Sequence, residues 1–309
     1  MKPATPPTSR LGGAPTAGET AAAPSPPELQ RSLSRAVEAE GMAVHGGQAV
    51  RLRLEPAPPD TGIVFERSDL TGAPSIRVSP DRVDRRGLKR MTVLRAAEDE
   101  NVQVGMVEHL LAACAGLGVW NLRARVDGPE CPIFDGSALP YAELILSAGP
   151  ATQTVPQRRW RLARPVAVWT DRGEVIALPA ERTRLTTFTE LARGGMPDQQ
   201  ATFVPDRDDF LAEIAPARTW CFEDEVQALR EDGLIRGGSL DCAVVLRDGG
   251  PVGGSFRLQG EPARHKLLDL MGDLAVLGRP VAAMISARAA GHSLHQAFIA
   301  ELRRHLIDA

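Results

Sequence analysis

The stretch ARHKLLDLMGDL, residues 263–274, decides the fold of this chain. Its leucines and its methionine recur at helical spacing, which predicts a helix. His265 and Asp269 lie four residues apart, about one helical turn, so an imidazole and a carboxylate share one face of that helix. A helix offers two ligands to one metal ion in this way. The stretch therefore indicates a metal site that needs a third ligand from elsewhere in the chain.

A second helix is predicted in GMVEHLLAACAGLG, residues 105–118, where glycines follow an apolar stripe. His109 stands beside Glu108 at the start of this helix and is one of only six histidines in the chain. Two histidines and one aspartate leave a position on zinc open for water, as in catalytic sites. A neighbouring carboxylate could take the proton of that water. The apolar stripe consists of Val107, Leu110, Leu111 and Cys114.

Spacing alone leaves a structural interpretation open. A histidine four residues from an aspartate also arises by chance, and a Glu-His pair at a helix start is commonly surface or capping chemistry. From these residues alone, the metal site is the less favoured interpretation.

Composition bounds the class of protein. The chain has 309 residues, 43% hydrophobic and 24% charged, which is typical of a soluble globular protein and long enough for two domains. The net charge of −3 is small and both signs are interspersed, so nothing indicates nucleic-acid binding. The four cysteines are scattered without CxxC spacing and are expected to be reduced core residues: Cys114, Cys131, Cys221 and Cys242.

Targeting signals are not visible in the sequence. No stretch approaches the roughly 18–20 continuous apolar residues that cross a bilayer, and the N-terminus lacks an apolar signal core. We therefore expect a cytoplasmic protein. Residues 1–28 are rich in proline and alanine and nearly devoid of large apolar side chains, so we expect a disordered extension there.

The rest of the chain mixes strand and helix patterns. Val50, Leu52 and Leu54 alternate with arginines, as in a half-buried strand, and further strands are expected at 62–69, 75–79 and 120–128. A second set of segments begins near residue 154. Its expected strands are 158–170, 173–181, 184–191 and 280–288, and its expected helices are 208–214, 222–234, 264–277 and 291–306. We predict an α+β fold with two similar halves, 29–153 and 154–309, as two α/β layers that face each other.

Five ordered segments together resemble the UDP-3-O-acyl-N-acetylglucosamine deacetylases, zinc enzymes of lipid A synthesis in Gram-negative bacteria. The resemblance runs from about residue 29 to the end. The segments are QRSLSRAVEAEGMAVHGG (30–47), MVEHLLAACAGLGVWNLRARVDGPECPIFDGSALPY (106–141), ARTWCFEDEVQALREDGLIRGGSLDCAVVL (217–246), RHKLLDLMGDLAVLGRP (264–280) and ARAAGHSLHQAF (287–298).

The resemblance implies roles for individual residues. The family's metal ligands fall on His109, His265 and Asp269, the three residues that helical spacing offers. Glu108 falls on the general base that activates water at the metal. His292 falls on a histidine that is protonated in the ground state. A cationic imidazole there stabilises an oxyanion and donates a proton to the departing amine.

Further residues match the substrate site of the family. Asp273, one turn beyond Asp269, is placed to hold the His292 imidazole. Thr219 matches a threonine that helps to bind the oxyanion, and Lys266 matches a lysine that contacts substrate. His45 matches a histidine near the substrate, although capping a turn is an equal explanation. Without the family, His292 reads as a cap or loop histidine; on the last helix, solvent exposure is expected of His295 and His305.

The family fold places the active site between two α/β domains and adds a small βαβ insert that forms a passage for the acyl chain. Here residues 217–246 fill that place. Its expected apolar lining also reads as the core of an amphipathic helix: Trp220, Cys221, Phe222, Leu229, Leu234 and Ile235.

The resulting hypothesis is a zinc-dependent amidohydrolase that removes acetate from UDP-3-O-acyl-N-acetylglucosamine, the committed step of lipid A biosynthesis, and works as a monomer. Iron(II) suits the same ligands. Residues 190–203 and Met106 depart from the family pattern, which keeps another acylated amino sugar open as substrate. A nucleotide-sugar sensor without catalysis is the binding-class alternative, and an intact Glu108 argues against it.

Overall fold

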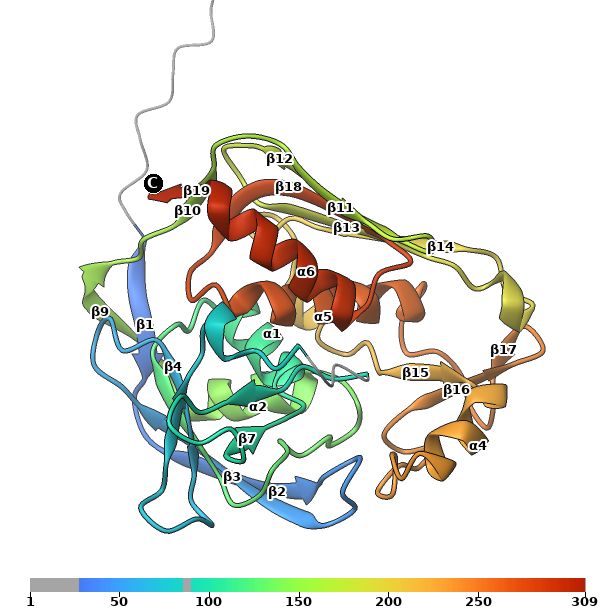
Figure 1. The fold of residues 1–309 in the computed structure, drawn as a ribbon, viewed down its shortest axis with the longest axis horizontal. Coiled ribbons are helices and arrows are strands. Elements are labelled where there is room, and N and C mark those ends of the chain that lie inside the picture. The colour runs from blue at the N-terminus through green and yellow to red at the C-terminus, as the bar shows by residue number, and fades with distance from the viewer. Residues whose placement is uncertain (1–27, 86–89, 309) are drawn as a thin grey trace, which may run out of the picture.

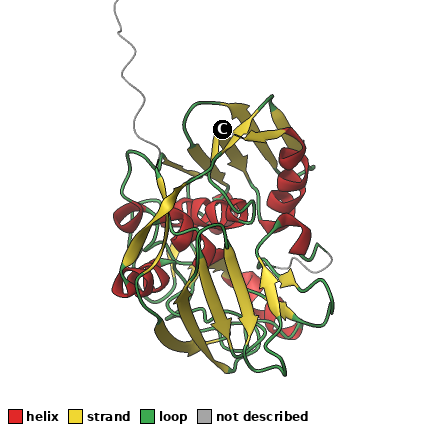
Figure 2. Ribbon diagram, turned by 90° about the vertical axis from the view of Figure 1, so that its left-hand side faces the viewer, coloured by secondary structure: helices red, strands yellow, loops and turns green. Residues whose placement is uncertain are grey.

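Two sheets face each other through the helices that cover them in the computed structural model, which describes residues 28–85 and 90–308 (Figure 1). A quarter turn shows the same helical layer between the sheets (Figure 2). The fold is therefore the predicted α+β sandwich of two halves. The expected disordered extension lies outside the described residues, except for Glu28.

The first half is a five-stranded sheet in the order β2-β3-β8-β4-β5. The strand predicted from alternation is β3, Ala49–Pro56, where Val50, Leu52 and Leu54 are buried. It pairs antiparallel with β2 and β8, while β4 runs parallel to β8. The other strands are β2 (Val37–Met42), β4 (Ile63–Arg67), β5 (Ser75–Arg77) and β8 (Leu122–Val126), and the helices are α1 (Glu108–Gly116) and α2 (Leu139–Ala148).

The second half is a seven-stranded sheet built around β18, Val281–Arg288, which runs parallel to β10 and β13 and antiparallel to β12. Helices α5 (Glu261–Ala275) and α6 (His292–Leu302) cover it (Figure 1). The other strands are β10 (Trp160–Leu162), β11 (Val166–Trp169), β12 (Glu174–Pro179), β13 (Arg184–Thr189), β14 (Gln199–Phe203) and β19 (Leu306–Asp308).

Several boundaries differ from the sequence prediction. The single strand expected at 158–170 is two strands, because the chain changes neighbours near Pro165: β10 pairs with β18 and β19, whereas β11 pairs with β12. The last helix was expected to reach residue 306 but ends at Leu302; a 3-10 turn, η3 (Arg303–His305), and β19 follow. Short elements without a periodic signal were not predicted: β1 (Leu29–Leu33) with β9 (Pro150–Pro156), β6 (Leu94–Arg95) with β7 (Gln103–Val104), and the turns η1 (Pro80–Arg82) and η2 (Ala192–Gly194).

A small βαβ unit projects from the second half. Its strands β15 (Trp220–Phe222) and β16 (Val244–Arg247) are parallel and are joined through α4 (Glu223–Glu231); β17 (Gly250–Pro251) completes the sheet. It packs on its own apolar cluster, separate from the main core: Leu191, Met196, Val244 and Leu246, with Trp220, Phe222 and Phe256 against them. This unit is the predicted insert. We keep the domain boundary at 153/154, which lies within β9, as a proposal.

The core lies where α1 and α5 cross between the sheets. Nearly every residue of α5 is buried, so apolar side chains occur on several faces of this helix. Four of its buried residues are nevertheless ionisable and recur every fourth position: Glu261, His265, Asp269 and Asp273. Helical periodicity therefore gives the central helix one polar stripe inside the protein. Among the strands between α2 and α4 lies one short α-helix, α3 (Phe210–Glu213).

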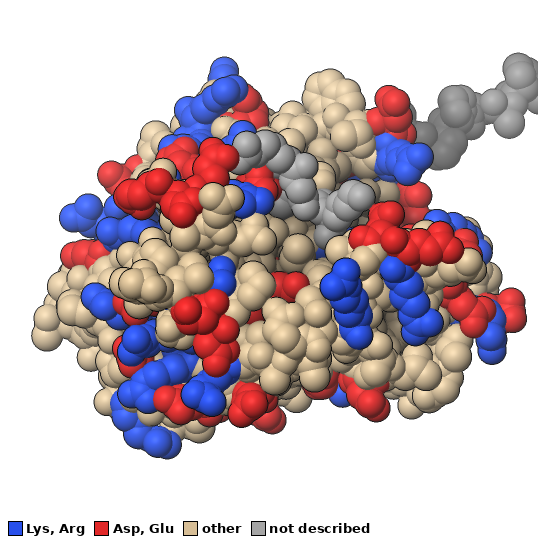
Figure 3. All heavy atoms as spheres, turned by 60° about the horizontal axis from the view of Figure 1, so that its bottom comes forward, with Lys and Arg blue, Asp and Glu red and all other residues tan. Residues whose placement is uncertain are grey.

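The distribution of charged residues and the length of the helices bear on the class of protein. Lysine, arginine, aspartate and glutamate are interspersed over the face drawn in Figure 3. Across 28–85 and 90–308, no helix combines the length and the apolar character needed to span a membrane.

Gly272 sets the distance between α1 and α5. A Cβ atom at this position would lie 2.0 Å from the Glu108 carbonyl oxygen. Gly272→Ala must therefore push the helices apart, and we expect the free energy of unfolding to fall by about 1–3 kcal/mol. Urea denaturation measures the change. Gly250→Ala is the matched control, because a Cβ there meets nothing within 4 Å; equal stability of the two variants would contradict the close approach.

Candidate metal centre and catalytic site

Three helices bring the predicted site residues together beside one cavity of about 780 Å³, whose wall includes Glu108, His109, Asp269 and His292 but not His265. The start of α1 carries Glu108 and His109, the middle of α5 carries His265 and Asp269, and the start of α6 carries His292. Every one of these side chains is buried. Residues far apart in the sequence therefore meet because α1, α5 and α6 share the central layer (Figure 1).

The candidate metal ligands form one cluster. Each of His109, His265 and Asp269 offers a ligand atom within 4.8 Å of the others. The Nε2 atom of His265 lies 3.3 Å from Oδ1 of Asp269, and the rings of His109 and His265 are 5.2 Å apart at 88°. The arrangement joins one ligand from the first half with two from the second.

Donor chemistry at this cluster fits a metal ion. The Nδ1 atom of His265 lies 3.0 Å from the Ala217 carbonyl oxygen, which assigns the proton to Nδ1 and leaves a lone pair on Nε2. In His109, Nδ1 is buried and has no hydrogen-bond partner among the described residues, a costly state for a polar atom. Burial and the nearby His265 lower the pKa of His109 to about 3, so its ring is neutral, as a ligand must be.

Asp269 supplies the negative charge. Burial opposes its ionisation, but the neighbouring His265 and Lys266 hold the pKa of this carboxyl well below its usual range. The Nζ atom of Lys266 lies 3.0 Å from Oδ2 of Asp269. Two imidazoles and one carboxylate are a donor set that suits zinc.

Glu108 is buried beside this cluster and faces His292. Its Oε2 accepts a hydrogen bond from the Thr92 amide at 3.0 Å, and its Oε1 lies 3.6 Å from Nε2 of His292. Burial raises the pKa of Glu108 to about 7, against the opposing charge of His292. A carboxylate whose pKa lies near neutrality is suited to general-base chemistry.

His292 is held by Asp273. The His292 Nδ1 atom lies 2.7 Å from Oδ2 of Asp273. Although burial favours the neutral ring, the charges of Asp273 and Glu108 raise the pKa of His292 to about 10. For Asp273, burial is outweighed by His292 and by hydrogen bonds, which lower the pKa to about 2. His292 is therefore a cation at neutral pH, with its Nε2 atom 3.6 Å from Oε1 of Glu108.

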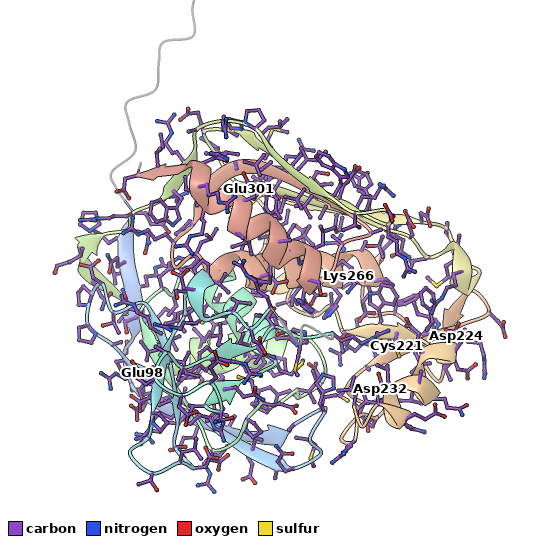
Figure 4. All side chains as sticks on the ribbon, in the orientation of Figure 1. Glu98, Cys221, Asp224, Asp232, Lys266 and Glu301 are labelled. Atoms are coloured by element: carbon purple, nitrogen blue, oxygen red, sulfur yellow. The ribbon has the colours of Figure 1, made fainter. Side chains whose placement is uncertain are left out.

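The predicted substrate contacts line the same cavity. Thr219, Trp220, Lys266 and His45 all belong to its wall, and His45 Nε2 is a buried nitrogen without a partner among the described residues. The His45 Nδ1 atom accepts weakly from the Ile235 amide at 3.4 Å. Figure 4 shows Lys266 on the side of α5 that faces the insert, where Cys221 and Asp224 lie. Leu234 does not line the cavity. The other five expected apolar residues do: Trp220, Cys221, Phe222, Leu229 and Ile235.

Cys221 also differs from the expected core cysteines. It is only partly buried, because it belongs to the cavity wall, whereas Cys114, Cys131 and Cys242 are buried free thiols.

The prediction of a solvent-exposed His295 is wrong. This side chain is 1% exposed, and its Nδ1 lies 2.8 Å from Oδ2 of Asp273. The reason is that α6 turns this face toward α5. His305 is partly buried in η3 and pairs with Glu301 at 3.1 Å. The spacing of His292, His295 and Gln296 places them on one helical face, a signal that could have identified the cluster.

Other contributors were not predicted, because their partners lie far away in the sequence. Glu261 pairs with Arg218 at 2.8 Å and so anchors the segment that carries Thr219. Arg90 from the first half pairs with Glu225 of α4 at 2.7 Å across the cavity. These contacts join residues more than 40 positions apart, which periodicity does not report.

The cavity wall also contains backbone strain. Met106, Ile235 and Ala289 have positive φ angles of 55°, 49° and 46° and line the cavity. This conformation is uncommon for any residue except glycine and is an outlier for a β-branched one. Such strain clusters at functional sites.

Comparisons with known proteins agree with the geometry. The family model described as LpxC, UDP-3-O-acyl N-acetylglycosamine deacetylase, matches residues 30–304. Proteins named UDP-3-O-acyl-N-acetylglucosamine deacetylase are similar over most of the chain. The one from Chromobacterium violaceum is 39% identical over 280 residues, 89% of this chain and 90% of its own. That from Thermosynechococcus vestitus is 40% identical over 266 residues, 86% and 91%. That from Myxococcus xanthus is 38% identical over 271 residues, 87% and 85%.

The His292–Asp273 pair predicts a pH dependence of stability. Because folding raises the pKa of His292 from 6.5 to about 10, its stabilisation is fully present below about pH 6.5 and is lost as pH rises through about 10. In His292→Gln, we expect the free energy of unfolding to decline less over this pH range, by on the order of a few kcal/mol. Urea unfolding of both proteins at the two ends of the range measures it. Parallel stability curves for the two proteins would contradict the prediction.

Proposed function

Because this chain belongs to the UDP-3-O-acyl-N-acetylglucosamine deacetylase family, we propose that it hydrolyses the N-acetyl group of UDP-3-O-acyl-N-acetylglucosamine. The products are acetate and the free 2-amine, which the next acylation in lipid A synthesis requires. The observation that carries the proposal is the position of Glu108 and His292, 3.6 Å apart, beside three buried candidate metal ligands. We propose the cytoplasm as the location and a monomer as the working unit.

The metal that we propose is zinc, held by His109, His265 and Asp269. When bound, zinc supplies a Lewis acid that polarises the amide carbonyl and lowers the pKa of water. Iron(II) accepts the same donors, so metal content decides between the two.

The protein's own groups divide the proton transfers. Glu108 accepts a proton from the attacking water as its oxygen bonds to the carbonyl carbon. His292, cationic and held by Asp273, stabilises the developing oxyanion and donates its Nε2 proton to the amine as the C–N bond breaks. The Thr219 hydroxyl is the second proposed donor to the oxyanion. Transfer of the proton from Glu108 to His292 restores both groups, so each turnover consumes one water and releases the amine and acetic acid, which ionises to acetate.

The two ends of the substrate require different surroundings. The acyl chain fits the apolar wall provided by the insert, with Leu229 and Ile235 on it. A second cavity of about 710 Å³ shares Trp220 and Lys266 with the first. The wall of the second cavity has more cationic side chains than that of the first, which suits the diphosphate of the UDP group. Two of these cations, Arg193 and Arg288, also pair with carboxylates. The cations are Lys266, Arg172, Arg193 and Arg288.

The second cavity bears on the alternative substrate, another acylated amino sugar. Glu190, Ala192 and Arg193 line it and belong to the segment 190–203 that departs from the family pattern. A panel of UDP-linked and UDP-free acylated amino sugars separates the proposals. Turnover of another sugar in preference to UDP-3-O-acyl-N-acetylglucosamine would move the assignment to a paralogous deacetylase.

Removal of a ligand tests the metal site. His265→Ala should lose most of the zinc that the wild-type protein holds, because two ligands do not make a stable site. Elemental analysis after gel filtration measures the zinc per chain. His305→Ala is the control, since His305 lies in η3 outside the cluster. Full zinc occupancy in His265→Ala would reject the ligand assignment.

Removal of the base tests the chemistry. Glu108→Gln should keep zinc and lower acetate release by roughly 10²–10⁴-fold, because the amide cannot accept a proton. Acetate release from UDP-3-O-acyl-N-acetylglucosamine is the measurement. Unchanged turnover in the zinc-loaded variant would exclude Glu108 as the base. A wild-type protein that binds zinc and UDP-sugar without turnover would favour the sensor alternative.

A further inference from the structure

Thr92 contacts both proton-transfer groups of the site. It lies in the segment before β6, comes from the first half of the molecule and is fully buried. Its backbone amide donates to Oε2 of Glu108 at 3.0 Å. Its hydroxyl donates to Oδ1 of Asp273 at 2.5 Å. One residue therefore fixes the carboxylate of the base and the carboxylate that holds the acid.

These contacts close a ring of four groups. Glu108 Oε1 lies 3.6 Å from Nε2 of His292, and His292 Nδ1 lies 2.7 Å from Oδ2 of Asp273. Asp273 returns to Thr92 through its other oxygen. Thr92, which has no titratable group, thus fixes the distance between Glu108, which removes a proton, and His292, which delivers one.

The Asp273 carboxylate shows why the hydroxyl matters. Oδ2 accepts from two imidazoles, His292 and His295, while Oδ1 accepts from Thr92 and, at 3.3 Å, from the Gln296 amide. With Oδ1 occupied, the carboxylate cannot rotate without breaking bonds at both oxygens. Because His295, Gln296 and His292 all belong to α6, the hydroxyl of Thr92 is the contact from the other half of the protein.

We propose that Thr92 is a positioning residue for catalysis, which sets the geometry between Glu108 and His292 through its amide and its hydroxyl. The inference rests on the proposed function. It predicts a loss in the chemical step and little change in substrate binding, because Thr92 is not among the residues that line the cavity.

Thr92→Val tests the proposal, because it keeps the shape and the backbone amide but removes the hydroxyl. We expect kcat to fall on the order of 10- to 100-fold, with KM and zinc content unchanged. Thr92→Ser restores the hydroxyl and should recover most of kcat. Thr183→Val is the matched control: it also loses one hydroxyl bond, to the Val281 carbonyl at 2.8 Å, away from the site, and should keep wild-type kcat.

Either of two results overturns the proposal: Thr92→Val retains kcat within a factor of about two, or Thr92→Ser loses as much kcat as Thr92→Val. If Thr92→Val does not fold, Thr92→Ala replaces it, with the same expectation and the same rescue by serine.

A second readout does not depend on turnover. The ring nitrogen and Nδ1 proton resonances of His292 should shift in Thr92→Val and return in Thr92→Ser, since the orientation of Asp273 sets this hydrogen bond. Unshifted resonances would overturn the role of Thr92 even in an inactive protein. Absence of acetate release by the wild type, together with shifted resonances, would instead reject the proposed function and keep the positioning role.

Discussion

The polar stripe buried along α5 is the constraint on which the rest of this structure depends. Glu261, His265, Asp269 and Asp273 are each at most 2% exposed, and an ionised group in such surroundings is costly unless it is paired. The structure pairs each of them from a different direction. Arg218 reaches Glu261 from the segment before β15, the Ala217 carbonyl accepts a hydrogen bond from His265, and α6 supplies two imidazoles to Asp273. Lys266, of α5 itself, approaches Asp269. The neighbouring elements are consequently held in register by these pairings.

The same constraint contributes to the packing of the two halves against each other. His109 completes a cluster whose other members belong to α5, and the Glu108 backbone lies against Gly272, where no side chain could fit. The polar cluster and the missing Cβ atom of Gly272 both hold α1 and α5 close together where they cross. The site is therefore assembled by the packing of the halves and not by either half alone.

Sequence reasoning reached the parts of this arrangement that are periodic. The four-residue spacing of His265 and Asp269, the alternation of Val50, Leu52 and Leu54, and the resemblance across five segments gave the two-half fold and the cluster of candidate ligands. The roles of individual site residues stay predictions until variants are measured. Partners that are distant in the sequence were not predicted, because Thr92, Arg90 and Arg218 act through tertiary contacts that leave no local pattern. His295 was misjudged because the direction of a helix face is decided by what the helix packs against.

The separate apolar cluster of the βαβ insert has a thermodynamic consequence. Local stability in a protein varies with the apolar surface that each cooperative unit buries, and units with small cores open far more often than the centre. The insert rests on Leu191, Met196, Val244 and Leu246, whereas α1 and α5 share the main core. We therefore expect this wall of the cavity to open as a separate unit, with amide hydrogens that exchange with solvent earlier than those of α1 and α5, which carry the candidate ligands. The wall that we propose for the acyl chain is therefore expected to be locally less stable than the helices that carry the candidate metal ligands.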